Sequence, residues 1–269
     1  MSDFINSFAS GLRSGKTAYA AWVGMTEPMA AEALAREGYD CVILDVQHGL
    51  HDVGSILAGI GGAAVAAKPA LVRIGVEEFP NASRYLDSGA AGVIAPMVNT
   101  IEDAKRFANF MKYPPLGERS WGPHRALGLT GLAPQDYLQK ANGQTLAIAM
   151  IETREAIAIL DDILAIPGID GVFVGPSDLS IALTKGATVD AFHPEVDSAL
   201  KHVSARAKAH NKIASAFCMT GARAGQLATW GYQLLSIGTD QIFMRMAGKA
   251  ELDTARGVAS GKVETPKSY

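Results

Sequence analysis

Residues 171–178, GVFVGPSD, and residues 146–152, LAIAMIE, each consist of an apolar run that leads to an acid, with a helix signal directly behind it. Short apolar runs that do not alternate with polar residues are typical of strands buried on both faces. The two stretches therefore predict buried strands that deliver one carboxylate each, Asp178 and Glu152, to the point where strand gives way to helix.

The same alternation of strand-like and helix-like runs extends along the chain. Strands are predicted at residues 18–23, 41–45, 70–74, 92–95, 146–152, 171–178, 212–217 and 233–238. Helices are predicted at 28–37, 53–67, 80–87, 101–111, 195–209 and 241–255. This order predicts an α/β fold of the (β/α)₈ TIM barrel type. A doubly wound open sheet is the alternative, but it would want a glycine-rich phosphate turn after the first strand, where residues 24–26 read GMT.

The barrel is expected to form a single domain over residues 1–269, since chains of about 250 residues usually form one α/β barrel domain. Residues 1–16 are predicted to contain an N-terminal helix, because their apolar residues fall on one helical face. Residues 112–145 form a long inserted connection, with a short helix expected at 134–140. Such connections are usually functional or disordered, and an oligomer contact without chemistry is the alternative. The polar tail, residues 261–269, is expected to be frayed.

Composition excludes several classes of protein. The net charge is −3 and no basic stretch indicates binding to nucleic acid or to an anionic membrane surface. No apolar run is long enough to span a bilayer, and residues 1–16 do not resemble a secretory signal. Cys41 and Cys218 both lie in apolar runs, which favours buried thiols over a disulfide. We therefore expect a soluble cytoplasmic protein.

Polar residues gather where the predicted strands end. In a barrel, the active site is built at the carboxyl ends of the strands. The second, third, fifth and sixth predicted strands bring the following residues to that end: Asp45, Gln47, His48, Arg73, Glu152 and Asp178. A base, a cation and two acids at one rim predict a catalytic site.

Glu152 and Asp178 are candidate ligands of a divalent metal. Two carboxylates leave most positions of an octahedral ion open to water and substrate, which favours Mg²⁺ or Mn²⁺ over a closed structural zinc site. The alternative for Asp178 is a helix N-cap without further function. The backbone N–H groups of Ser177 and Asp178 open that helix, and we expect a substrate carboxylate to bind there.

Arg73 and His48 are the candidate groups for proton transfer and charge stabilisation. Arg73 ends an apolar strand and either stabilises a developing oxyanion or forms a structural ion pair with a barrel acid. His48 follows Asp45 by three residues and is a plausible general base. No lysine ends a strand, which excludes a Schiff-base aldolase. Trp22, near the end of the first strand, either lines the pocket or belongs to the core.

Several motifs, taken together, resemble the HpcH/HpaI class II aldolases, a family that includes 4-hydroxy-2-oxoheptanedioate aldolase and 2-dehydro-3-deoxyglucarate aldolase. They lie in order between Trp22 and Ala250, at residues 45–49 (DVQHG), 72–73 (VR), 95–98 (APMV), 113–115 (YPP), 151–156 (IETREA) and 175–180 (GPSDLS). The resemblance implies metal-dependent, reversible retro-aldol cleavage of 2-oxo-4-hydroxy acids. The products would be an aldehyde and pyruvate, or hydroxypyruvate, formed through a metal-stabilised enolate. It also implies a homo-hexamer built as a trimer of dimers.

The resemblance also implies roles for individual residues. They are Glu152 and Asp178 as metal ligands, His48 as base, Arg73 as the group that stabilises the enolate, Asp87 as an acid that supports the base, and Ser177 and Asp178 as the backbone that holds the carboxylate. The ion implied is Mg²⁺ or Mn²⁺, with Co²⁺ or Zn²⁺ as alternatives. Asp45, the acid near His48, is also expected to be catalytic, and Gln47 and Trp22 are expected to contact the substrate.

Two departures from the family pattern concern the substrate more than the reaction. Gln47 stands where close relatives have Glu, and Met150 stands where some relatives have a substrate-binding Gln. Residues 119–123, RSWGP, also differ. Alternative functions are an oxaloacetate decarboxylase or a citrate-lyase-like C–C lyase, and a barrel that binds a 2-oxo acid without catalysis.

Overall fold

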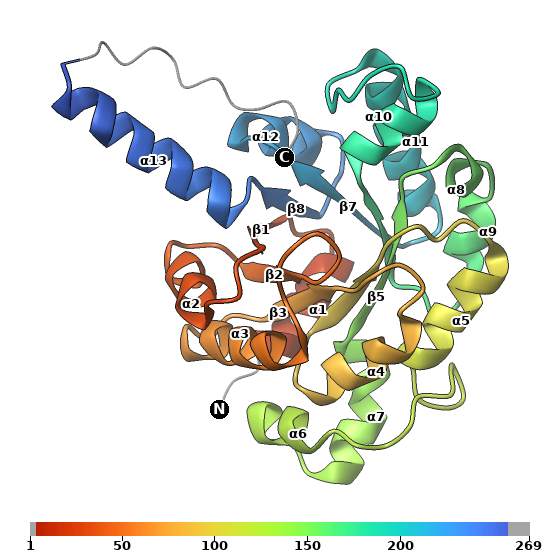
Figure 1. Cartoon of the computed structure of the whole chain (residues 1–269). Helices are drawn as coiled ribbons and strands as arrows, with labels where there is room; N and C mark the ends of the chain where they lie inside the picture. Colours follow the sequence, from red (N-terminus) through yellow and green to blue (C-terminus); the bar gives the residue numbers. More distant parts are fainter. Residues whose placement is uncertain (1–3, 258–269) are drawn as a thin grey trace.

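The computed structural model describes residues 4–257, and its strands form one closed parallel barrel in the order β1 to β8 (Figure 1). The strands are β1 (Ala18–Val23), β2 (Cys41–Asp45), β3 (Ala70–Arg73), β4 (Gly92–Ala95), β5 (Leu146–Ile151), β6 (Gly171–Val174), β7 (Ile213–Cys218) and β8 (Leu234–Ile237). The predicted (β/α)₈ barrel is confirmed. β5 ends directly before Glu152, but β6 already ends at Val174, so the strand predicted at 171–178 is too long and Asp178 lies in the first turn of the following helix. The tail predicted at 261–269 lies outside the described residues.

Helices surround the barrel, and the last one extends away from it (Figure 1). They are α1 (Phe4–Arg13), α2 (Pro28–Arg36), α3 (Val53–Val65), α4 (Phe79–Asp87), α5 (Ile101–Met111), α6 (His124–Thr130), α7 (Pro134–Gln144), α8 (Arg154–Ala158), α9 (Leu160–Ala165), α10 (Pro176–Leu183), α11 (Pro194–Ala209), α12 (Gly221–Thr229) and α13 (Asp240–Ala255). None of the helices in this part of the chain is both long and apolar enough to cross a bilayer.

Side-chain caps fix where several helices start. The Asp52 carboxylate accepts from the Ser55 N–H at 2.8 Å and so begins α3. Thr100 and Thr239 cap α5 and α13 in the same way. These caps satisfy N–H groups that have no partner inside the helix. The turns from strand to helix at the carboxyl end of the barrel are therefore held in defined positions.

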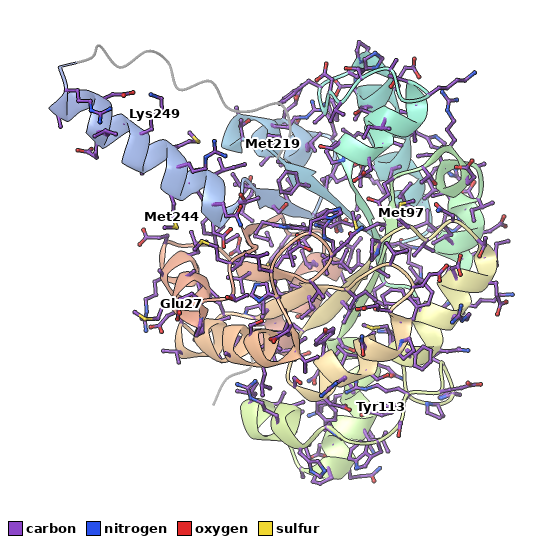
Figure 2. The ribbon with its side chains drawn as sticks, viewed as in Figure 1. Glu27, Met97, Tyr113, Met219, Met244 and Lys249 are labelled. Carbon is purple, nitrogen blue, oxygen red and sulfur yellow. The ribbon has the colours of Figure 1, made fainter. Side chains whose placement is uncertain are left out.

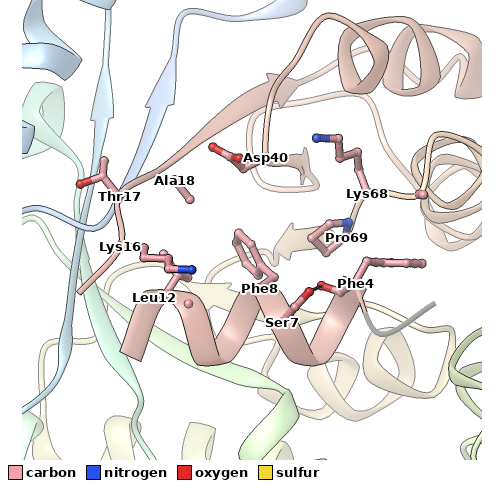
Figure 3. A pocket seen from close by; sticks show the side chains of 12 residues that line it. Phe4, Ser7, Phe8, Leu12, Lys16, Thr17, Ala18, Asp40, Lys68 and Pro69 are labelled. Atoms are coloured by element: carbon pink, nitrogen blue, oxygen red, sulfur yellow. Dashed lines mark hydrogen bonds between the residues drawn. The ribbon is translucent and has the colours of Figure 1, made fainter. Parts of the chain in front are cut away.

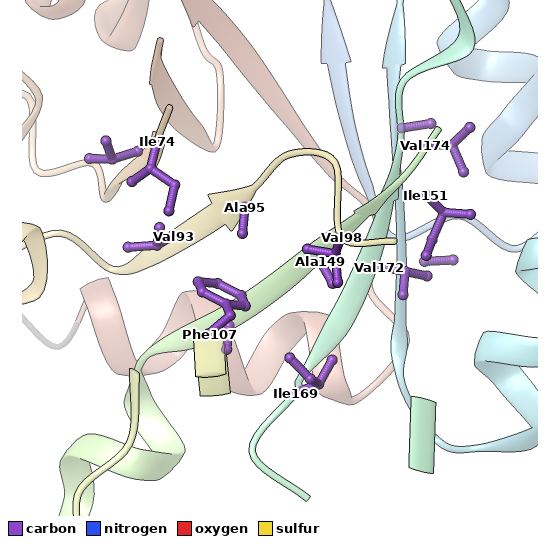
Figure 4. Close-up of a cluster of buried hydrophobic side chains, with 14 of the residues drawn as sticks. Ile74, Val93, Ala95, Val98, Phe107, Ala149, Ile151, Ile169, Val172 and Val174 are labelled. Carbon is purple, nitrogen blue, oxygen red and sulfur yellow. The ribbon is translucent and has the colours of Figure 1, made fainter. Parts of the chain in front are cut away.

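The strands are apolar throughout because both of their faces are buried. Along β5, Ile148 and Met150 point into the barrel and belong to an interior cluster with Trp22 and Phe173. Ala149 and Ile151, like Val172 and Val174 of β6, belong to the outer cluster between barrel and helices (Figure 4). Successive side chains thus alternate between the barrel interior and the layer below the helices. Because both places are apolar, the strand sequences do not alternate between apolar and polar residues.

Helix α1 covers the amino end of the barrel. Its residues Ala9 and Leu12 are buried in the same cluster as the barrel interior. A cavity of about 270 Å³ remains between α1 and the strand starts, where Phe8 faces Pro69 (Figure 3).

The connection 112–145 is more ordered than predicted. It contains two helices, and the one expected at 134–140 continues to Gln144 as α7. Lys112 is buried, and its Nζ donates to Asp170 at 2.6 Å and to the Thr145 carbonyl at 2.8 Å. Arg119 lies over the Tyr113 ring at 4.5 Å. This packing explains how a segment rich in glycine and proline holds a fixed course.

Candidate active site

A cavity of about 400 Å³ opens at the carboxyl ends of the strands, where parallel barrels carry their active sites. Its walls come from the ends of β1, β2, β6 and β8 and from the first turns of α10 and α13. Among the wall residues are Trp22, Asp45, His48, Ser177 and Asp178. The chain thus brings predicted site residues from three separate strands to one cavity.

A smaller space, of about 10 Å³, lies deeper in the barrel mouth. It shares Trp22, Ser177 and Asp178 with the larger cavity and extends to Arg73 and Met150. A volume of this size holds about one water-sized group. The mouth of the barrel is therefore not filled by apolar packing.

Glu152 is a buried carboxylate beside this mouth, with 2% of its surface exposed. The N–H of Met97, in the loop after β4 (Figure 2), donates to its Oε1 at 2.8 Å. Burial raises the pKa of Glu152 to about 7, against the effect of the Met97 N–H, and the charge of Asp178 raises it further. Two neighbouring carboxylates in apolar surroundings repel each other when both are charged. Binding of a proton or a cation relieves this repulsion.

Ser177 and Asp178 occupy the first turn of α10. The N-cap of this helix is Gly175, so Asp178 is not the cap that its sequence position also allowed. The first α-helical bond runs from the Leu179 N–H to the Gly175 carbonyl at 3.0 Å, and the N–H groups of Ser177 and Asp178 precede it. N–H groups in this position are suited to binding an anion.

Arg73 and Asp45 form an ion pair inside the barrel mouth. Nε and Nη2 of Arg73 donate to the two oxygens of Asp45 at 2.8 and 2.6 Å. Burial alone would raise the pKa of Asp45, but the hydrogen bonds and charge of Arg73 outweigh it and hold that pKa below its usual value. The structural ion pair considered for Arg73 is thus present, and Arg73 also reaches the smaller space.

His48 is exposed in the turn after β2 and lines the cavity. Its backbone N–H donates to Oδ1 of Asp45 at 3.3 Å. Asp45 thus fixes the backbone of His48, while its carboxylate charge is neutralised by Arg73. The imidazole is left facing the cavity, as a base that acts on a substrate requires.

Trp22 has both of the roles considered for it. Its ring packs against Phe173 and Phe217 in the barrel interior, and its Nε1 donates to Asp45 at 3.2 Å. It also lines both spaces at the mouth. Gln47, in contrast, is absent from the walls of these two spaces, and within the described residues its Oε1 is buried without a hydrogen-bond partner.

Asp87 does not lie with the other predicted site residues. It ends α4, which returns from the carboxyl end of β3 to the amino end of β4. Its carboxylate pairs with Arg119 at 2.7 Å. Asp87 therefore does not support His48 within one chain, because the topology places the two residues at opposite ends of the barrel.

The residues at the mouth fit a divalent cation held by few protein ligands. Within residues 4–257, no group of three or more His, Cys, Asp or Glu side chains forms a metal cluster. Two carboxylates, Glu152 and Asp178, could hold such an ion there and would leave its other positions to water and substrate, as open oxygen-ligand sites allow. Gly175 leaves room for the carboxylate of Glu152 because it has no side chain. A Cβ at this position would lie 2.5 Å from Oε2 of Glu152.

Two residues of the cavity wall were missed by sequence reasoning. Asp240, at the start of α13, accepts hydrogen bonds from the N–H groups of Gly24 at 3.1 Å and Met25 at 2.9 Å. Arg245 lines the cavity one turn further along α13. The predicted closed barrel could have placed them here. Closure sets β8 beside β1, so the start of the helix after β8 lies next to the end of β1.

Comparison with known proteins gives consistent matches over most of the chain. Residues 19–247 match the family model described as HpcH/HpaI aldolase/citrate lyase. The hydroxypyruvate/pyruvate aldolase of Rhizorhabdus wittichii is 36% identical over 254 residues, which cover 94% of this chain and 100% of the relative. The 5-keto-4-deoxy-D-glucarate aldolase of Citrobacter koseri is 32% identical over 244 residues, covering 91% of this chain and 94% of the relative.

A solved structure agrees with the sequence relatives. The HpcH/HpaI aldolase/citrate lyase family protein from Burkholderia cenocepacia superposes with a TM-score of 0.83 at 30% identity. The match covers 93% of this chain and 99% of that one. The similarity therefore extends over nearly the whole chain.

Proposed function

The chain belongs to the HpcH/HpaI aldolase/citrate lyase family, and from this premise we propose that it is a metal-dependent aldolase, a carbon–carbon lyase. It cleaves 2-oxo-4-hydroxy acids to pyruvate, or hydroxypyruvate, and an aldehyde, and it catalyses the reverse condensation. The observation that carries the proposal is the buried carboxylate of Glu152 behind Gly175, near Asp178, which lines the same cavity as His48.

The helix start at α10 would bind the carboxylate of the 2-oxo acid. The N–H groups of Ser177 and Asp178 precede the first helical bond there. Glu152 and Asp178 would hold a divalent cation, which supplies Lewis-acid polarisation of the 2-oxo carbonyl. We propose Mg²⁺ or Mn²⁺ rather than Co²⁺ or Zn²⁺, because both ligands are carboxylates.

His48 acts as the general base in cleavage. It removes the proton from the C4 hydroxyl, the C3–C4 bond breaks, and the electron pair passes into the pyruvate enolate while the aldehyde departs. Arg73, in the space beside Trp22 and Asp178, stabilises the negative charge that develops on the enolate oxygen. A proton returned to C3 completes the formation of pyruvate.

A homo-oligomer, a hexamer built as a trimer of dimers, is part of the proposal. Helix α13 supports it, since among its residues only Asp240 and Ile242 are buried, whereas Met244 and Leu252 are exposed. Light scattering of the purified protein measures the mass of the oligomer and so tests this state.

A cytoplasmic location is also proposed. It is supported by Cys41 and Cys218, which are both free and buried.

Pyruvate release from a 2-oxo-4-hydroxy acid, with and without EDTA, tests the proposed function. We expect EDTA to abolish the turnover of the wild-type protein and added Mg²⁺ or Mn²⁺ to restore it. In Asp178→Ala, neither ion should restore turnover. EDTA-resistant cleavage would refute the metal dependence. Oxaloacetate in the same assay tests for a decarboxylase. Binding of pyruvate without turnover of any substrate would instead indicate a non-catalytic barrel.

A further inference from the structure

The cavity at the amino end of the barrel takes no part in the proposed reaction (Figure 3). It lies between α1, the start of β1 and the turn that leads from α3 to β3. The proposed catalytic residues stand at the opposite, carboxyl end of the strands. Its volume of about 270 Å³ is close to the lower end of the range for small-molecule pockets, about 300 Å³. The space therefore suits a small organic molecule.

An apolar wall forms one side of this amino-end cavity. Helix α1 contributes Phe4, Phe8 and Leu12, which are four positions apart and so share one helical face. Pro69 lies on the other side, opposite Phe8 (Figure 3). Phe4 and Phe8 are only partly buried, so an apolar group in the cavity would cover surface that is now exposed to water.

Two lysines enter the cavity from opposite sides, Lys16 after α1 and Lys68 before β3 (Figure 3). The backbone fixes where each of them stands. The Lys16 N–H donates to the Gly11 carbonyl at 3.0 Å, and the Lys68 N–H donates to the Ala63 carbonyl at the same distance. Within residues 4–257, neither ammonium group takes part in an ion pair or hydrogen bond. Both cations are therefore available to a ligand.

Asp40 is the one acid among the described residues of this wall. Its Oδ2 accepts from the Tyr19 N–H at 2.8 Å, which holds the carboxylate at the start of β1. In the same part of the chain it forms no ion pair with either lysine. Two cations against one acid leave the wall with a surplus positive charge. A ligand with a single negative charge would neutralise this surplus.

We propose that the amino-end cavity is a second ligand site, which binds a small carboxylate with an apolar body. The carboxylate lies between Lys16 and Lys68, and the apolar body packs against Phe8 and Pro69. Such a ligand contacts α1, β1 and the turn before β3 at once, and so holds in place the helix that covers this end of the barrel. The site uses none of the residues of the proposed aldolase reaction.

Calorimetry with two probes of the same shape tests the recognition of charge. 3-Phenylpropionate carries a carboxylate, and 3-phenylpropanamide is neutral. We expect the acid to bind about tenfold more tightly than the amide, as one charged hydrogen bond allows. Lys16→Met and Lys68→Met should each reduce this preference by weakening the binding of the acid alone. Methionine keeps an unbranched apolar chain along the wall, so the amide should bind as before.

Further measurements locate the probe. A Cβ at Gly11 would lie 3.7 Å from Cδ of Lys16, an ordinary contact, so Gly11→Leu places a side chain in the cavity and should abolish binding of both probes. Leucine also favours a helix more than glycine, and circular dichroism checks that the fold is kept. Lys105→Met, at an exposed position of α5, is the matched control and should bind both probes like the wild type. Saturating pyruvate with Mg²⁺ should displace neither probe.

Several outcomes would overturn this inference. They are a wild-type protein that binds the acid no better than the amide or not at all, and lysine variants that bind the acid like the wild type. Displacement of the acid by pyruvate would locate it at the carboxyl end instead. Tighter binding of phenylalanine than of 3-phenylpropionate would mean that the ligand class is an amino acid, whose ammonium group meets Asp40. Each of these results leaves the proposed aldolase reaction untouched.

Discussion

Arg73 and Asp45 face each other across neighbouring strands and are joined by two hydrogen bonds of 2.8 and 2.6 Å. Parallel register pairs the two residues, so both side chains point to the barrel interior. Asp45 also accepts from Trp22 and from the backbone of His48. The pair thus connects the barrel interior to the turn that carries the proposed base.

Asp45→Asn should destabilise the protein strongly. It removes the carboxylate charge beside an arginine that is 2% exposed, and removing one partner of a buried ion pair typically costs about 3–5 kcal/mol. Urea unfolding measures the loss. Asp161→Asn, which breaks the exposed pair with Arg206, is the matched control and should have a much smaller effect. Equal losses in the two variants would contradict a structural role for the Asp45 pair.

His48→Ala should lower kcat by about 10²–10⁴, the usual contribution of a positioned general base. Binding of pyruvate, measured by calorimetry, should be unchanged, because the proposed carboxylate site lies in α10. His202→Ala, an exposed histidine of α11, is the control and should leave kcat as it is. Unchanged turnover in His48→Ala would mean that another group is the base.

The stability of the metal-free protein should fall as pH rises from about 4.5 to about 7 through the contribution of Glu152. In the folded state its pKa is about 7, against an ordinary value of 4.5, so the folded form holds a proton that the unfolded form has already released. The contribution is on the order of 3 kcal/mol. Urea unfolding with a chelator present, at pH 5 and at pH 8, should show this fall in the wild type and a flatter profile in Glu152→Gln.

Glu155→Gln, at an exposed position three residues further along the chain, is the control and should keep the wild-type profile. If Glu152→Gln also kept it, the carboxylate of Glu152 would not be the group that titrates. A divalent cation replaces that proton, so Mg²⁺ should raise the stability of the wild type more at pH 8 than at pH 6.

Gly175→Ala should weaken activation by the cation. The added Cβ would lie 2.5 Å from Oε2 of Glu152 and force that carboxylate to move. Displacing a supporting contact of a metal ligand typically costs about 10–100-fold in metal affinity. Activity measured against Mg²⁺ concentration gives the shift. Gly225→Ala in α12, where a Cβ meets nothing within 4 Å, should leave the Mg²⁺ dependence unaltered.

The strands and most of the mouth residues were predictable because their signals are local. Each buried strand is an uninterrupted apolar run, and the acid that follows it must stand at the carboxyl end of the barrel. The pairing of Arg73 with Asp45 required more, since only the register of β2 with β3 decides between an ion pair and a free cation. Both readings of Arg73 were open until that register was known.

Asp240 and Arg245 escaped prediction because nothing in the α13 sequence distinguishes them. An acid in a first helical turn and an exposed arginine are common in any helix. For Asp87 only the motif resemblance indicated a role, and the topology excludes a contact with His48 within one chain. A helix that returns from one strand to the next carries its last residue to the amino end of the barrel.

The nesting of the two spaces at the mouth has a kinetic consequence. The pocket beside Arg73 and Met150 communicates with the outside past Trp22, Ser177 and Asp178, which also border the larger chamber. The inner pocket takes about one water-sized group, so the rest of a 2-oxo acid that reaches it lies in the larger chamber, where a second molecule would cover it. We therefore expect the outer product to leave first and the inner one second, and only the inner product should compete directly with the next donor.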